Sequence, residues 1–376
     1  MQTYAVYFYP RGPSASVIGS DTLFGAVCWG LRVLDLVTDL DAWLDGPAPS
    51  FAFSSALPAW YNRDGAPMLR LYPLPETFGA VQTDVEALAG YLRESKRYSE
   101  RQALLESTRQ AKRFKSVAYL SESLFTQVVD NTLQPGQALL ALAAEKPKLV
   151  QVGNILLSKV ETDALVAEGV NTALPPVMVE AVQHNSVDRV AGATVEGLLF
   201  YKNEVYFAPQ AGYWALLRAS EADLQKLILP ALRYLEDTGL GGSRTTGKGH
   251  YKIRVEPAPA LPAAANPNGV MLLSRYLPAE NDGIALQGAP LAYRLITLRP
   301  RREQKFPQAI SMSQTAPVYK QPLRVFEPGS VFPLRKAQEI YGAIARVVPP
   351  GEGAPAHQSG AALPVFIHIR ESVSHG

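Results

Sequence analysis

The sequence predicts an α+β protein of two ferredoxin-like (RRM-like) domains, the first of which carries a large insertion. Its 376 residues, 47% hydrophobic and 19% charged, suffice for two globular domains of ordinary size. Residues 1–255 contain a strand, a helix, further strands, a helix and a strand, which is the order of a split βαβ unit. Residues 256–269, EPAPALPAAANPNG, separate this unit from later strand-like runs and predict a semi-rigid linker.

The elements of the first domain follow from hydrophobic spacing and from residues that start or stop regular structure. A β-branched and aromatic run predicts the first strand, and helical spacing after a cap at residues 20–21 predicts the first helix. The alternating segment VEGLLFYKNEVYF predicts a hairpin that turns at residues 202–204. The second helix opens at Ser220 and is expected to stop at Gly239. The predicted elements are strand 2–9, helix 22–37, hairpin 195–207, strand 213–218, helix 220–239 and strand 251–255.

The second domain, residues 270–376, is expected to be a degenerate copy of the first. Strand-like runs at 270–276, 293–299 and 365–370 and a helix-like run at 334–347 give it similar elements. Residues 40–180 have no counterpart in the split βαβ order. We therefore assign them to the insertion in the first domain.

Composition and charge exclude several classes of protein. Lys+Arg number 36 and Asp+Glu 34, a formal net charge of +2, so a nucleic-acid-binding surface must be a local patch. Cys28 is the only cysteine and no Cys/His cluster has zinc spacing, so we expect no internal disulfide, no metal site and no cofactor. The most apolar stretch, 23–37, is interrupted by charges and glycines and is too short to span a bilayer. The start lacks the pattern of a secretory signal, so the expected location is cytoplasmic.

A glycine-rich segment, GLGGSRTTGKGHY at residues 239–251, is the sharpest motif. Its glycines let the backbone approach a ligand closely, its N–H groups and hydroxyls can donate to phosphate oxygens, and its cations add positive charge. It is not a nucleotide P-loop, since Gly249 follows Lys248, nor a dinucleotide fingerprint, since it leads into a strand. Phosphate contact is favoured over a flexible loop whose glycines only relieve crowding. The predicted phosphate-binding residues are Gly239, Gly241, Gly242, Ser243, Arg244, Thr245, Thr246, Gly247, Lys248 and Gly249.

A basic stretch at residues 93–115 lies within the insertion. Its first half also contains glutamates and is explained by a solvated helix face with i,i+4 ion pairs. Its end, KRFK at residues 112–115, has no acidic neighbour before Glu122. Lys112, Arg113 and Lys115 are therefore predicted to contact a phosphodiester backbone, and Phe114 to lie in the core or to stack on a base.

Together with four further segments, the glycine-rich segment resembles a known family. The segments are SDTLFGA at 20–26, HNSVDRVAGAT at 184–194, SRYLP at 274–278 and PGSVF at 328–332. A glycine-rich loop after the second helix of a ferredoxin-like domain is a hallmark of the RAMP proteins of CRISPR systems. Within their Cas-five-like group, the chain is similar to the fourth-subunit family of type III-A Csm effector complexes. The resemblance touches most of the chain but extends little into residues 40–180.

The resemblance implies a non-catalytic RNA-binding subunit of a ribonucleoprotein effector in antiviral defence. Such a subunit grips the 5′ repeat-derived handle of the CRISPR RNA (crRNA) and caps the base of the complex. Its implied partners are the crRNA 5′ handle, the large signature subunit and a backbone RAMP subunit, and no membrane is involved. The implied binding positions are the loop 239–249 and the segment 184–189, with His184, Asn185 and Arg189. Candidates for stacking on single-stranded bases are Phe114, Tyr119 and Tyr251.

Histidines are the obvious general bases for one alternative, a crRNA-processing endoribonuclease of the Cas-six type. Among the five histidines, only His184, near Asp188, and His250, beside the glycine-rich loop, are candidates to contact an RNA from two sides. The first-helix region, where such enzymes usually carry their catalytic histidine, contains none, and spacing for a metal-dependent hydrolase is missing. We therefore expect no catalytic residue and no enzyme activity. The endoribonuclease and a purely structural assembly protein remain as alternatives.

Overall fold

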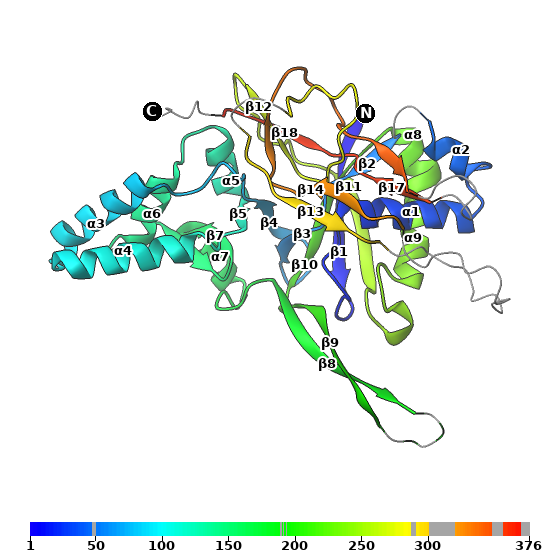
Figure 1. Ribbon diagram of the computed structural model, residues 1–376, viewed down its shortest axis with the longest axis horizontal. Helices are drawn as coiled ribbons and strands as arrows, with labels where there is room; N and C mark the ends of the chain where they lie inside the picture. Colours follow the sequence, from blue (N-terminus) through cyan, green and yellow to red (C-terminus); the bar gives the residue numbers. More distant parts are fainter. Residues whose placement is uncertain are drawn as a thin grey trace.

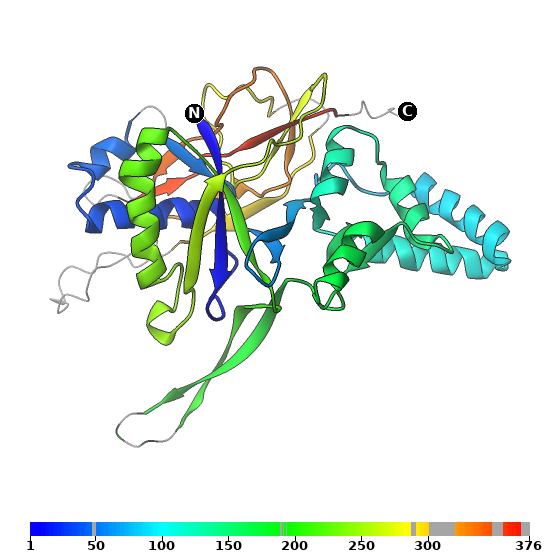
Figure 2. The same ribbon diagram turned by 180° about the vertical axis from the view of Figure 1, so that it is seen from behind.

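The computed structural model describes residues 1–46, 50–188, 190, 192, 194–286, 291–300, 320–347 and 356–369. Figures 1 and 2 show a body built on a large sheet, a helical lobe at one end, a projecting two-stranded arm and C-terminal strands packed over the body. A large mixed sheet combined with helices confirms the α+β class. The division into two ferredoxin-like domains remains a prediction.

The body contains a nine-stranded sheet in the order β11-β1-β10-β3-β4-β5-β7-β6, with β2 also paired to β10. β5 and β7 are parallel, and the other pairs are antiparallel. The expected strands 2–9, 213–218 and 251–255 are present as β1, β10 and β11. The strands are β1 Gln2–Pro10, β2 Phe51–Phe53, β3 Leu57–Tyr61, β4 Pro67–Pro73, β5 Tyr119–Ser121, β6 Leu149–Val152, β7 Ile155–Ser158, β10 Ala211–Ala219 and β11 Tyr251–Pro257.

β10 lies between two hydrophobic clusters because successive side chains of a strand point to opposite faces. Tyr213 and Leu217 belong to the cluster formed with helices α1 (Ser20–Val33) and α9 (Leu229–Thr238). Trp214 belongs to the cluster on the other face, which includes apolar residues of the helical lobe and of the C-terminal strands. Both faces of the sheet are therefore covered at this strand.

The first helix differs from the prediction at both ends. α1 starts at Ser20 with Gly19 as its N-cap, so residues 20–21 lie inside the helix instead of capping it. It ends at Val33 and not at residue 37, because Asp35 takes a left-handed φ of 52° that a helix does not contain. The second helix ends at Gly239 as expected. It consists of α8 Glu221–Asp223, a π-helical turn η1 Leu224–Ile228 and α9.

The helical lobe is formed by residues that the sequence assigned to the insertion (Figure 1). α3 and α4 form its projecting helical hairpin, and Ser99 caps α4 by accepting a hydrogen bond from the Gln102 N–H group. Strands β2, β3 and β4 also come from residues 40–180, but they pair within the body sheet. The helices of the predicted insertion are α2 Leu40–Leu44, α3 Gln82–Lys96, α4 Glu100–Phe114, α5 Glu122–Val129, α6 Pro135–Ala143 and α7 Lys159–Ala167.

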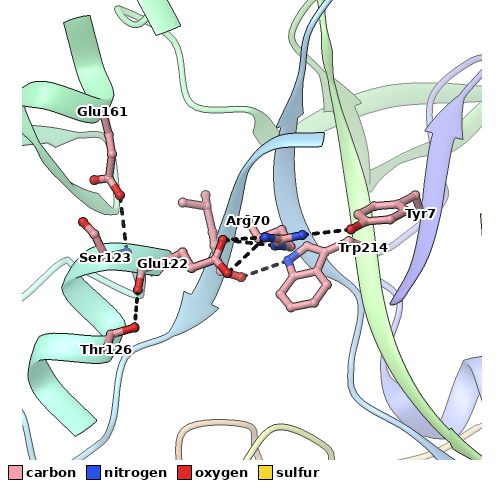
Figure 3. A network of polar contacts seen from close by, with 8 residues as sticks. Tyr7, Arg70, Glu122, Ser123, Thr126, Glu161 and Trp214 are labelled. Carbon is pink, nitrogen blue, oxygen red and sulfur yellow. Dashed lines mark hydrogen bonds and ion pairs between the residues drawn. The ribbon is translucent and has the colours of Figure 1, made fainter. Parts of the chain in front are cut away.

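Arg70 on β4 links the body to the helical lobe (Figure 3). Its guanidinium donates to both carboxylate oxygens of Glu122, the first residue of α5, at 3.1, 3.1 and 2.9 Å. It also donates to the Tyr7 hydroxyl of β1 at 3.0 Å and lies over the ring of Trp214. Bidentate pairs of this kind fix both distance and orientation, so the contact sets how α5 sits against the sheet.

The arm consists of β8 (Val177–Val187) and β9 (Thr194–Phe207), which pair with each other in a sheet of their own (Figures 1 and 2). The predicted hairpin at 195–207 is therefore wrong. Residues 202–204 continue β9, and Glu204 is paired in register with Glu180. A projecting two-stranded ribbon has little buried surface to distinguish a polar strand segment from a turn, which explains the error.

The C-terminal part consists of short strands. β12 (Gly269–Leu272) lies between β15 (Val331–Pro333) and β18 (Pro364–Ile367). Strands expected at 270–276, 293–299 and 365–370 are present in shorter form. The remaining pairs are β13 Leu295–Leu298 with β14 Leu323–Phe326 and β16 Ile344–Arg346 with β17 His357–Ser359.

The helix predicted at residues 334–347 is not formed. Tyr341 instead makes an antiparallel bridge with Ala362, and its ring is fully buried. Gly342 follows with a φ of 88°, where a Cβ atom would lie 2.2 Å from the carbonyl oxygen of Gly360. The helix-like spacing of apolar residues thus belongs to a segment that holds this bridge and the short strand β16.

A buried ion pair joins the C-terminal part to α1. Asp21 accepts hydrogen bonds from Arg275 Nη1 at 2.7 Å and from the Gln358 side-chain amide at 2.6 Å. The Arg275 backbone N–H group donates to the Ser20 hydroxyl at 2.9 Å. Two of the segments that carry the family resemblance, 20–26 and 274–278, therefore meet here.

Arg275→Met should lower the free energy of unfolding by about 3 kcal/mol, because it leaves the buried Asp21 carboxylate without its cation. Urea unfolding followed by circular dichroism measures the change. The same substitution at Arg109, whose side chain is 82% exposed and 3.8 Å from Glu106, is the control. It should cost less than about 0.5 kcal/mol. Equal losses in the two variants would contradict a stabilising role for the buried pair.

Candidate nucleic-acid interface

The glycine-rich loop connects α9 to β11 through backbone conformations that glycine adopts easily. Gly239, Gly241, Gly247 and Gly249 have φ values of 83°, 86°, 82° and 72°. At Gly249 a Cβ atom would lie 2.1 Å from the Leu240 carbonyl oxygen, so no other residue fits without a shift of the backbone. The sequence thus predicted both the location and the unusual backbone of this loop.

Three consecutive backbone N–H groups in the loop remain available to a ligand. Those of Gly241, Gly242 and Ser243, here called the donor row, have no hydrogen-bond acceptor within the described residues. Ser243 has a left-handed φ of 58° and is exposed, as is Thr245 in the following 3-10 turn, η2 (Arg244–Thr246). Successive N–H groups around a left-handed residue form concave sites for anions.

Lys248, five residues after Ser243, forms an ion pair with Glu204 on β9. Glu204 is buried, and its Oε1 atom also lies 2.9 Å from His184 Nε2 on β8. The Tyr206 hydroxyl donates to Glu204 Oε2 at 3.2 Å. Residues of the loop and of both arm strands therefore converge on one buried carboxylate.

The segment between β1 and α1 closes this junction. Ser14 and Val205 exchange backbone hydrogen bonds of 2.9 and 2.8 Å, which attaches the segment to the base of the arm. The Gly249 N–H group donates to the Pro13 carbonyl oxygen at 2.9 Å, and the Arg11 N–H group to that of His250 at 2.8 Å. The loop, the arm and residues 11–14 thus form one connected surface.

The histidines of the predicted site occupy different surroundings. His184 stacks on Phe200 with ring centroids 5.5 Å apart, and the Lys202 ammonium lies 5.1 Å from the same ring. His250 Nε2 lies 3.3 Å from the Arg244 carbonyl oxygen, to which it can donate. Asn185 is exposed on β8. The predicted Arg189 lies outside the described residues.

The basic stretch is not brought to the loop. Lys112, Arg113 and Lys115 are exposed at the end of α4, in the helical lobe, whereas the loop follows α9 at the opposite end of the body (Figure 1). Arg113 donates to the Gln151 carbonyl oxygen at 3.0 Å. Lys112 and Lys115 line a cavity of about 550 Å³ beside α4. They form a second basic surface on another element.

Two of the aromatic residues proposed for base stacking are not available for it. Phe114 is 3% exposed and Tyr251 is 1% exposed, and both lie in hydrophobic clusters. Burial raises the pKa of the Tyr251 hydroxyl to about 12, in keeping with a side chain removed from water. Tyr119 is half-buried. Phe200 and Tyr201, which are exposed on the arm, were missed by the sequence.

Glu204 was also missed, because the sequence misplaced it in a turn. Its partners Lys248 and His184 are distant in sequence, and only the pairing of β8 with β9 brings them together. In the described part of the chain, no three His, Cys, Asp or Glu side chains gather into a group that could hold a metal ion. None of the described helices combines the length and the apolar character that a membrane crossing requires.

Comparisons with known proteins extend these observations. No family model matches the sequence. A curated protein of Thermococcus onnurineus (strain NA1), the "CRISPR system Cms protein Csm4", is 24% identical over 250 residues. This match covers 66% of the chain and 66% of the relative, slightly less than two thirds of its length.

Solved structures share the fold over nearly the whole chain. A chain of a Csm3–Csm4 subcomplex of the type III-A CRISPR–Cas interference complex matches with a TM-score of 0.60 and 15% identity, covering 98% of this chain and 100% of that chain. A chain of a Csm1–Csm4 cassette in complex with AMPPNP matches with a TM-score of 0.54 and 16% identity, covering 99% and 100%. The chain is thus similar in sequence to a curated Csm4, and it shares its fold with chains of the Csm3–Csm4 and Csm1–Csm4 assemblies.

Proposed function

We propose that the chain is the Csm4-type subunit of a type III-A CRISPR effector complex, where it grips the 5′ repeat-derived handle of the crRNA without catalysing a reaction. It would cap the base of the complex in the cytoplasm, beside a large signature subunit and a backbone RAMP subunit. The similarity to a curated Csm4 supports this assignment, and the Csm1–Csm4 and Csm3–Csm4 assemblies support the presence of two protein partners.

The donor row is the observation that carries the RNA-binding part of the proposal. Its three consecutive N–H groups have no acceptor among the described residues, and Ser243 and Thr245, which are exposed, add hydroxyl donors. A negatively charged phosphate oxygen can accept several of these hydrogen bonds at once. Such hydrogen bonds are stronger than those to a neutral acceptor, so the site favours phosphate. Contacts to the phosphates of the RNA backbone leave the bases of a single strand free to be recognised at their edges.

The domain boundaries are part of the proposal as well. We propose that residues 1–255 and 270–376 are two domains that are joined by the linker 256–269 and pack together in one hydrophobic cluster. In support, the described residues between Pro257 and Gly269 form neither helix nor strand. The ferredoxin-like character of each unit stays a prediction.

Gly242→Val should weaken binding of the single-stranded handle about tenfold or more, because the branched side chain keeps phosphate from one or more donors of the loop. The protein itself can accommodate the change, since a Cβ atom on Gly242 would lie 3.6 Å from Ala15 Cβ, an ordinary contact. Fluorescence anisotropy with labelled handle RNA measures the affinity. Gly90→Val on α3, where no atom lies within 4 Å, is the control and should bind normally. Normal affinity of folded Gly242→Val would remove the RNA role from the loop.

The purified chain should not cleave labelled repeat RNA, with or without divalent metal. A transesterification requires an acid and a base aimed at the 2′-OH and at the leaving oxygen, but His184 Nε2 is paired with Glu204 and His250 Nε2 lies against the Arg244 carbonyl oxygen. His184→Ala and His250→Ala should leave guide maturation by the assembled complex intact at matched RNA occupancy. Specific cleavage that His184→Ala abolishes at unchanged RNA affinity would favour the endoribonuclease alternative.

The complex with the large signature subunit should survive ribonuclease treatment during co-purification. The formal net charge of +2 confines attraction to RNA to local patches, so direct protein contacts are expected to help hold this subunit in place. Size-exclusion chromatography of the tagged pair, before and after digestion, measures the association. A pair that separates when the RNA is removed would instead be bridged by RNA.

A further inference from the structure

Glu204 occupies a position where a charge is costly unless it is paired, since only 4% of its side chain is exposed. Both carboxylate oxygens are used: Lys248 and His184 contact Oε1, and Tyr206 donates to Oε2. We propose that Glu204 is a positioning residue that holds the glycine-rich loop on the base of the arm, with Lys248 as its anchor and not as a phosphate ligand. This inference rests on the RNA-binding function proposed above.

The burial of Lys248 supports its role as an anchor. Only 15% of its side chain is exposed, although it lies in a surface loop between two glycines. At contact distance the opposite charges of Lys248 and Glu204 largely cancel, so the pair contributes little positive potential to an approaching phosphate. A lysine that served as a phosphate ligand would instead extend its ammonium group toward the solvent side of the loop.

The backbone next to Lys248 explains how the anchor controls the donor row. Gly247 and Gly249 flank it with φ values of 82° and 72°, and glycines at such positions offer little resistance to rotation. The Lys248 N–H group lies 3.4 Å from the Ser243 carbonyl oxygen, at the end of the donor row. The Leu240 N–H group donates to the Gly249 carbonyl oxygen at 2.8 Å and closes the other side of the loop. The Lys248 side chain therefore acts together with these backbone hydrogen bonds to hold the spacing of the donors.

The direction in which Glu204→Gln changes RNA affinity distinguishes a positioning role from a purely electrostatic effect. Glu204→Gln keeps the size of the side chain but removes a negative charge close to the proposed RNA site. Coulomb attraction alone predicts tighter RNA binding after this change. Positioning predicts weaker binding, by about tenfold, because the loop loses its ionic anchor and must be ordered when RNA binds.

Glu180→Gln is the matched control for Glu204→Gln. Glu180 lies on β8 directly opposite Glu204 in the strand register, but it is exposed. The substitution removes the same charge from the same arm without releasing Lys248. We expect Glu180→Gln to bind the handle as tightly as the unmodified protein or slightly more tightly.

Lys248→Met tests the anchor from the loop side. It should weaken handle binding to the same extent as Glu204→Gln, and the double variant should be no weaker than either single variant, since all three break one link. The dependence of log affinity on log salt concentration should keep its slope. A phosphate ligand would lose about 0.7 from that slope when replaced by methionine.

A distance measurement detects the positioning without RNA. The native Cys28 is buried, so spin labels can be attached to cysteines introduced at Thr245 in the loop and at Leu199, an exposed residue of β9. Pulsed electron spin resonance should give a narrow distance distribution that broadens in Glu204→Gln and stays narrow in Glu180→Gln. Thermal unfolding confirms that each variant is folded at the temperature of the measurement.

Three results would overturn the inference: unchanged or tighter RNA binding by folded Glu204→Gln, additive losses in the double variant, or a salt slope reduced by Lys248→Met. The Gly242→Val experiment separates this failure from a failure of the proposed function. If Gly242→Val weakens RNA binding but Glu204→Gln does not, only the positioning role is wrong. If neither changes RNA binding, the loop does not bind RNA.

Discussion

Strand β10 is the element on which the rest of the structure depends, because it is buried almost throughout and supplies both large hydrophobic clusters. A strand in this position must have its backbone N–H and C=O groups satisfied inside the protein. β1 pairs with one edge and β2 and β3 with the other, and the Trp214 indole N–H donates to the Leu71 carbonyl oxygen at 3.1 Å. The ends of β1 and β10 then determine where the 11–14 segment and the arm leave the body.

Local signals predicted the parts of the fold whose neighbours are close in sequence. β1, β10 and the helical segment that stops at Gly239 follow from alternation, helical spacing and a glycine stop. The arm and the 334–347 segment were wrong because their conformations depend on distant partners: β8 for Glu204, and Ala362 for Tyr341. The spacing of apolar residues indicates that a segment is buried, but it does not indicate which distant segment packs against it.

The candidate site was predictable in the same limited way. The glycine-rich loop could be found because the glycines that permit its backbone conformation are close together in the sequence. Its role in RNA binding stays a prediction. The sequence placed Lys248 among the phosphate contacts, since nothing near it in the chain reveals a carboxylate on another element. The partner becomes visible only when β9 is paired with β8 and the buried Glu204 contacts Lys248.

Several segments that resemble the RAMP family hold parts of the protein together. Segments 20–26 and 274–278 meet in the buried pair of Asp21 and Arg275. In the segment 328–332, Gly329 accepts a hydrogen bond from the Glu76 N–H group at 2.9 Å and donates to the Leu272 carbonyl oxygen at 2.8 Å. These segments of the resemblance therefore make contacts inside the protein, whereas the proposed RNA contacts depend on the glycine-rich loop.

The two outer strands of the body sheet affect how this protein can meet its neighbours. β11 and β6 form the ends of the sheet. β11 carries exposed Lys252 and Arg254 and ends at Pro257, and Pro147 and Lys148 immediately precede β6. Cations and prolines at a sheet edge disfavour pairing with a strand of another chain. Growth of the sheet across a subunit boundary is therefore disfavoured, and contacts within an assembly would fall on helices, loops and the arm.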